Sequence, residues 1–113
     1  MSEYIPDKWV VIKIIHTTET LYKVLGSWSG GYAQGDSWRM NSGIVQSTKE
    51  DGTTTFYGAS GSNYVCNDFG YGVNGLSSDV LDRLLKQAEE SNTFDIKVMN
   101  HDTDWSSIDW EIS

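Results

Sequence analysis

The chain has 113 residues, a formal net charge of −8 and one cysteine, Cys66. This length suits a single globular domain over residues 1–113 that buries roughly two thirds of its unfolded surface. One cysteine excludes an internal disulfide, and the acidic N-terminal segment MSEYIPDKWVV does not have the basic start of a secretory signal. No apolar run approaches the roughly 20 residues of a membrane-spanning helix. These features predict a cytoplasmic protein that does not enter membranes.

Strand patterns dominate the first two thirds of the chain. Lys8–His16 is β-branched and aromatic, which is typical of a strand buried on at least one face, and Thr20–Ser27 alternates as its hairpin partner. Asp51-Gly52 predicts a type I′ turn between two further strands. The remaining strands are expected at Ile44–Lys49, Thr53–Tyr57, Ser62–Asn67 and Phe94–Met99.

One amphipathic helix is expected over Ser78–Ser91. Ser77 or Ser78 can cap its start and Asn92 can close its end. Its apolar residues form one stripe that should pack on a sheet: Val80, Leu81, Leu84, Leu85 and Ala88. Strands followed by one helix and a last strand predict an α+β fold. We expect an antiparallel sheet of five or six strands, with the helix packed on one face.

Negative charge gathers at the C-terminal end, where seven carboxylates face one lysine in the last 25 residues. We treat the chain from about residue 100 as an acidic stretch, with Trp105 and Trp110 as anchors that hold it to the domain. Because nucleic-acid binding requires clustered Lys and Arg, direct binding of DNA or RNA is disfavoured. Solubility is the simplest role for this charge.

The segment Leu25–Gly43 combines bulky aromatic residues with five glycines and one base, Arg39. Such a composition is typical of a shaped loop held by its own rings, and such loops often carry function. A shorter Ser-Gly-aromatic pattern recurs at Ser60–Tyr64 and suggests a second turn beside the first. The candidate binding residues are therefore Trp28, Ser29, Tyr32, Trp38, Arg39, Ser60, Ser62 and Tyr64.

Catalytic patterns are weak in this sequence. Cys66 could pair with His16 or His101, but a buried strand cysteine is the simpler interpretation. The segment His101–Asp104 could hold a hard cation, yet it lacks the glycine and closing glutamate of a calcium loop. Neither a nucleophile elbow nor a phosphate-binding P-loop is present. We therefore expect no catalytic residues, no metal site and no cofactor.

Three binding hypotheses remain, in this order. In the first, the glycine-aromatic loops contact another protein, because Trp, Tyr and Arg dominate interface hot spots; the alternative for Trp28 and Trp38 is that they only close the end of the sheet. In the second, backbone N–H groups of Ser29–Gly31 and Ser60–Ser62 and the Arg39 side chain bind a small anionic ligand of nucleotide or sugar type. In the third, the protein mimics nucleic acid through Asp102, Asp104, Asp109 and Glu111.

Two strings, GSWSGGYAQGDSWRMNSGI and YGASGSNYVCNDFGYG, followed by the helix from Ser77, resemble small accessory proteins of tailed bacteriophages. The resemblance covers roughly Tyr22–Glu90. That family has no assigned activity, so the resemblance implies nothing about catalytic residues. It implies a compact protein, made in an infected cell, whose partner is a host or phage protein.

Overall fold

The computed structural model describes residues 3–29, 37–108 and 110. Within them the chain forms an α+β fold of eight strands, one α-helix and two short 3-10 helices. The strands are β1 (Glu3–Tyr4), β2 (Lys8–His16), β3 (Thr20–Trp28), β4 (Ser37–Met40), β5 (Ile44–Glu50), β6 (Thr53–Gly58), β7 (Asn63–Asn67) and β8 (Phe94–Val98). The helices are η1 (Asp68–Gly70), α2 (Gly75–Ser91) and η2 (Trp105–Ser107).

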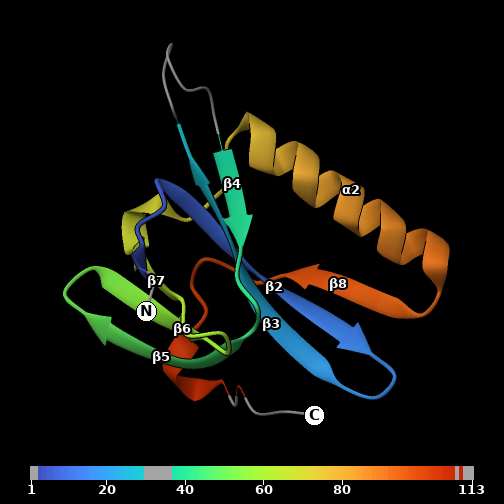
Figure 1. Cartoon of the computed structure of the whole chain (residues 1–113), viewed down its shortest axis with the longest axis horizontal. Coiled ribbons are helices and arrows are strands. Elements are labelled where there is room, and N and C mark those ends of the chain that lie inside the picture. The colour runs from blue at the N-terminus through green and yellow to red at the C-terminus, as the bar shows by residue number, and fades with distance from the viewer. Residues whose placement is uncertain (1–2, 30–36, 109, 111–113) are drawn as a thin grey trace.

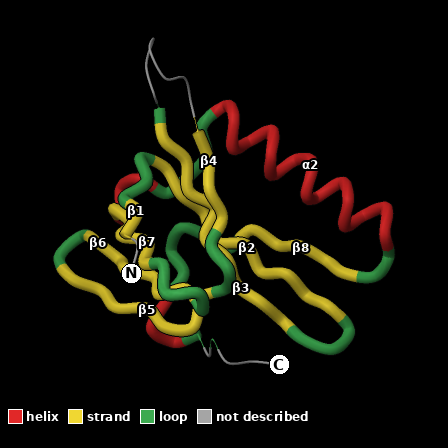
Figure 2. Tube along the Cα trace, in the orientation of Figure 1, coloured by secondary structure: helices red, strands yellow, loops and turns green. Residues whose placement is uncertain are grey.

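The strands form two sheets of four, where the sequence predicted a single sheet of five or six. The central sheet has the order β4-β3-β2-β8 and the outer sheet the order β1-β7-β6-β5. Figure 1 and Figure 2 show α2 on one side of the central sheet and the outer sheet on the other. The expectation of a single sheet is wrong, although the α+β class and the helix on one face are confirmed. The expected all-antiparallel pairing is also wrong at one place, because β1 pairs with β7 in parallel.

The composition of β2 explains why the central sheet is covered on both sides. Successive side chains of a strand point to opposite faces. Trp9 and Val11 contact the core between the two sheets, whereas Val10 and Ile12 contact the core under α2. All four are buried, with at most 4% of each side chain exposed. A strand that is apolar on both faces must bury each face against another layer of the structure.

Aromatic rings fill the core between the sheets. The ring centre of Trp9 lies 5.4 Å from that of Phe56, 4.7 Å from Tyr71 and 5.9 Å from Trp105. Trp110 packs edge-on against Tyr22 at 5.1 Å. The prediction that Trp105 and Trp110 anchor the C-terminal stretch is therefore confirmed.

The helix α2 begins three residues before the predicted start. Asn74 is the N-cap, since its side chain accepts from the Ser77 N–H at 2.8 Å while the Ser77 hydroxyl accepts from the Asn74 N–H at 2.9 Å. The Ser77 hydroxyl also donates to Ser27 of β3 at 3.2 Å, which fixes the first turn on the central sheet. The predicted end is confirmed, because Asn92 has a left-handed φ of 58°. The predicted stripe also packs on this sheet, with Val80 and Ala88 buried and Leu81, Leu84 and Leu85 partly buried.

The hairpin between β5 and β6 turns at Asp51-Gly52, as predicted, but the turn type differs. Gly52 has a φ of 78°, whereas Asp51 is not among the residues with positive φ. A type I′ turn requires positive φ at both central residues. Glycine is thus needed only at the second position of this turn.

We expect Gly70→Ala to destabilise the protein, because a Cβ at this position would lie 2.8 Å from the backbone carbonyl oxygen of Asp7. Backbone cannot move aside cheaply, so the cost should be about 1–3 kcal/mol, seen as a lower melting temperature by calorimetry. Gly75→Ala is the control, since open space surrounds Gly75. Equal melting temperatures for the two variants would contradict this packing.

Candidate functional site

The glycine-aromatic segment is a strand pair at both of its described ends, not a loop throughout. Leu25–Trp28 belongs to β3, and Ser37–Met40 forms β4, which pairs with it antiparallel. Trp38 lies opposite Ser27, and Arg39 lies opposite Gly26. Because successive side chains alternate, Trp38 and Arg39 lie on opposite faces of the central sheet. The predicted binding residues therefore do not form one face, and Tyr32 lies outside the described residues.

On one face, Arg39 and Trp28 both contact Tyr4 of β1. The Arg39 guanidinium carbon lies 4.5 Å from the centre of the Tyr4 ring, which is within cation–π range. Trp28 meets the same ring edge-on at 6.4 Å, and its indole N–H donates to the Ile5 carbonyl oxygen at 2.8 Å. Trp28 thus holds β1 against β3, which is a structural role. Arg39 remains exposed at the surface.

Tyr64 lies below this group and does not reach the surface. Only 1% of its side chain is exposed, and its ring centre lies 5.2 Å from that of Tyr4. Burial raises the pKa of Tyr64 to about 12, so its phenol is protonated at neutral pH. Any ligand contact with Tyr64 would require displacement of the rings above it.

The serine turns proposed to bind an anion already use several of their backbone donors. The Ser29 N–H donates to the Asp7 carboxylate at 2.9 Å, and the Ser60 N–H donates to the Ser42 hydroxyl at 3.0 Å. In the same turn, the Gly61 N–H donates to the Gly58 carbonyl oxygen at 3.0 Å, and the Ser62 carbonyl oxygen accepts from the Gly58 N–H at 2.8 Å. A ligand anion at Ser29 would meet the negative charge of Asp7. These contacts disfavour an anion site at both turns.

On the opposite face, Trp38 borders a groove between β4 and α2. We call this the Trp38 groove; it has a volume of about 170 Å³ and is lined by Trp38, Val80, Arg83, Leu84 and Gln87. The Trp38 side chain is 44% exposed, which is unusual for so large an apolar group. Sequence reasoning missed the helical part of this site. The spacing of Arg83 and Gln87, four residues apart, could have shown that they share a face of the helix.

The residues considered for catalysis, Cys66, His16 and His101, lie in surroundings that do not favour it. Cys66 is completely buried, its Sγ lies 3.7 Å from the Tyr64 carbonyl oxygen, and burial raises the pKa of its thiol. Both His16 and His101 are exposed, and His16 packs on the Phe94 ring at 5.5 Å. Among residues 3–29, 37–108 and 110, no three His, Cys, Asp or Glu side chains gather in a way that could hold a metal ion. Cys66 has the surroundings of a core residue.

Part of the acidic C-terminal stretch stabilises local structure. The Asp104 carboxylate caps η2, accepting from the Ser106 N–H at 3.1 Å and from its hydroxyl at 2.6 Å. Asp102 is exposed, whereas Asp109 and Glu111 lie outside the described residues. At least one carboxylate of the proposed nucleic-acid mimic is therefore used to order the chain itself.

Comparisons with models of known protein families, with curated proteins and with solved structures gave no match. In the described part of the chain, no helix is long and apolar enough to cross a membrane.

We expect the single thiol to be unreactive in the folded protein. Because burial raises the pKa of Cys66, little thiolate exists at pH 8, and the reagent cannot reach the sulfur. Reaction with the disulfide reagent DTNB at pH 8 should be at least about 100-fold slower in buffer than in guanidinium chloride. Similar rates in the two conditions would contradict a structural role for Cys66.

Proposed function

We propose that this is a non-catalytic binding protein that engages another protein through the Trp38 groove, in the cytoplasm of an infected bacterial cell. The exposure of the Trp38 indole beside Arg83 and Leu84 carries the proposal. Resemblance to small phage accessory proteins supports a host or phage protein as the partner.

The residue types in the groove are those that contribute most to protein interfaces. Trp and Arg are enriched among hot-spot residues, and Leu and Val methyl groups supply an apolar floor. Arg83 can donate paired hydrogen bonds to a carboxylate or carbonyl group of the partner, which favours a partner with an acidic or backbone acceptor beside an apolar side chain.

The groove lies on two ordered elements. Trp38 lies in β4, which pairs with β3 over four residues, and Arg83 lies in the middle of the capped helix α2. A contact surface held in its binding geometry loses less conformational entropy when the partner docks. This arrangement supports binding by the groove without refolding.

The other two hypotheses have less support. A small anionic ligand at the serine turns would compete with backbone donors that are already used at Ser29 and Ser60. A nucleic-acid mimic would depend on Asp104, which caps η2. Arg39, although exposed, packs on Tyr4 and has a role in holding β1.

We expect Trp38→Ser to abolish partner capture without unfolding the protein. Immobilised wild-type protein and variants would be mixed with lysate of the cells in which the protein is made, and retained proteins measured by quantitative mass spectrometry. Loss of a hot-spot indole costs about 2 kcal/mol or more, so capture of the specific partner should fall at least about 30-fold. Arg83→Ala should reduce capture as well.

Phe69→Ser is the matched control, because Phe69 is 91% exposed and lies in η1, away from the groove. This variant should capture the partner as well as the wild type does. Full capture by folded Trp38→Ser protein, or equal loss with Phe69→Ser, would refute the proposed surface.

A further inference from the structure

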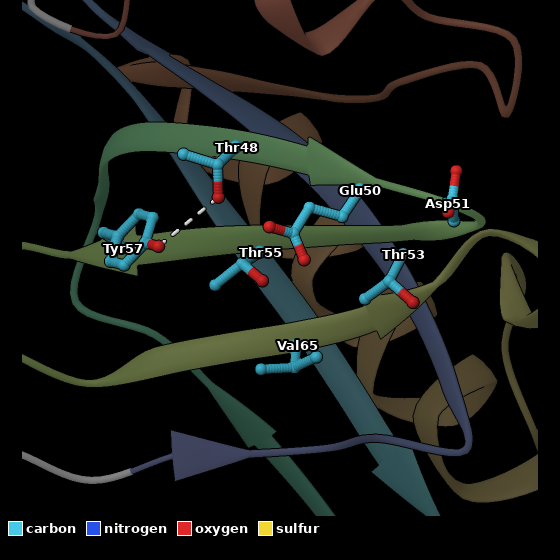
Figure 3. A pocket seen from close by; sticks show the side chains of 7 residues that line it. All are labelled: Thr48, Glu50, Asp51, Thr53, Thr55, Tyr57 and Val65. Atoms are coloured by element: carbon cyan, nitrogen blue, oxygen red, sulfur yellow. Dashed lines mark hydrogen bonds between the residues drawn. The ribbon is translucent and has the colours of Figure 1, made fainter.

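A second concave surface lies on the solvent-facing side of the outer sheet. This is a shallow pocket of about 530 Å³ (Figure 3). Its hydroxyl groups come from Thr48, Thr53, Thr55 and Tyr57, and we call it the threonine pocket. We propose that the threonine pocket binds a neutral carbohydrate, a function separate from protein binding at the Trp38 groove.

Strand alternation places these hydroxyl groups together. In β6, Thr54 and Phe56 are buried toward the core, so Thr53, Thr55 and Tyr57 face outward. Thr48 of β5 lies opposite Thr55, and Val65 of β7 lies opposite Thr55 on its other side. Directly opposed residues have Cβ atoms about 4.5–5.5 Å apart, so hydroxyl groups on β5 and β6 and the Val65 side chain on β7 can contact one ligand.

Two carboxylates and one aromatic hydroxyl give the pocket its hydrogen-bonding character. Glu50 lies opposite Thr53, and Asp51 follows it at the hairpin turn. The Thr48 and Tyr57 hydroxyl oxygens lie 3.3 Å apart in a hydrogen bond, which orients both side chains (Figure 3). Ionised carboxylates only accept hydrogen bonds, whereas hydroxyls both accept and donate. The ligand must therefore present several donors.

The charge of the pocket excludes anionic ligands. None of the described residues that line it is a Lys or an Arg. Lys49, the neighbour of Glu50, points to the other face of β5, where its ammonium lies 3.6 Å from the Asp68 carboxylate. Glu50 and Asp51 thus have no cation beside them in the pocket, and a phosphate or nucleotide would be repelled.

A sugar fits this lining better than an amine does. Sugar hydroxyls can donate to Glu50 and Asp51 in charge-assisted bonds and exchange hydrogen bonds with the threonines. The C–H face of a sugar ring can rest on Val65 and the Tyr57 ring. An amine would depend on attraction to exposed carboxylates, which is weak in water. The volume lies in the range of small-ligand sites, at about 300–1,000 Å³.

The test is an NMR titration of the ¹⁵N-labelled full chain with three neutral disaccharides, maltose, lactose and N,N′-diacetylchitobiose, each to about 20 mM. At least one should shift amide signals of β5 and β6, and raising NaCl from about 0.15 to 0.5 M should leave the affinity unchanged. Glu50→Gln and Thr55→Val should each weaken binding at least about fivefold. The controls Glu89→Gln on α2 and Thr18→Val in the β2–β3 turn should bind as the wild type does.

Spermidine is the competing probe. Shifts with spermidine but with none of the three disaccharides, lost in about 0.5 M NaCl, would replace the proposal with a cation site. Absence of shifts with all three disaccharides would overturn it, as would shifts confined to residues outside β5–β7. Trp38→Ser should bind the disaccharide normally, so failure of the Trp38 groove as a protein site would leave this result unaffected.

Discussion

The indole of Trp9 is the contact on which the two-sheet architecture depends. Its ring packs against Phe56 of the outer sheet, Tyr71 after η1 and Trp105 of η2, and its N–H donates to the Asn67 carbonyl oxygen at 2.7 Å. One side chain of β2 thus joins the central sheet to three separate segments of the chain. Large aromatic groups bury the most apolar area per residue, so this cluster supplies much of the stabilisation between the layers.

The tryptophans divide into structural and exposed groups. Trp9 and Trp105 are buried in the core, Trp110 packs on its edge, and Trp28 is bonded to the backbone of the β1–β2 connection. Trp38 alone among the five is exposed enough to count as a surface residue. The glycine-aromatic segment therefore has two structural consequences: it holds β1 on one side of β4 and leaves the Trp38 indole exposed on the other.

Local sequence signals allowed β2, β3 and β5–β8 to be predicted to within about a residue or two at each end: β-branched and aromatic composition, alternation, or the Asp51-Gly52 turn. β1 and β4 are too short to show one, and they form only through pairing with distant strands. The division into two sheets was missed because local patterns do not show which distant strands pair. At the site, Trp38 and Arg39 were identified, but their separation onto opposite faces follows from β4. That Arg83 lines the same groove as Trp38 could be seen only once the position of α2 on the sheet was known.

Trp38 is the tryptophan most exposed to solvent, and so the one available to a partner, while the other four pack within the structure. Fluorine NMR of protein labelled with 5-fluorotryptophan gives one signal for each of the five indoles, assigned by single Trp→Phe variants. The Trp38 signal should show the largest shift between H₂O and D₂O, and Trp9 and Trp105 should show almost none, since Trp38 is 44% exposed and the other two are 1% and 7% exposed. A solvent shift at Trp9 as large as that at Trp38 would contradict the account.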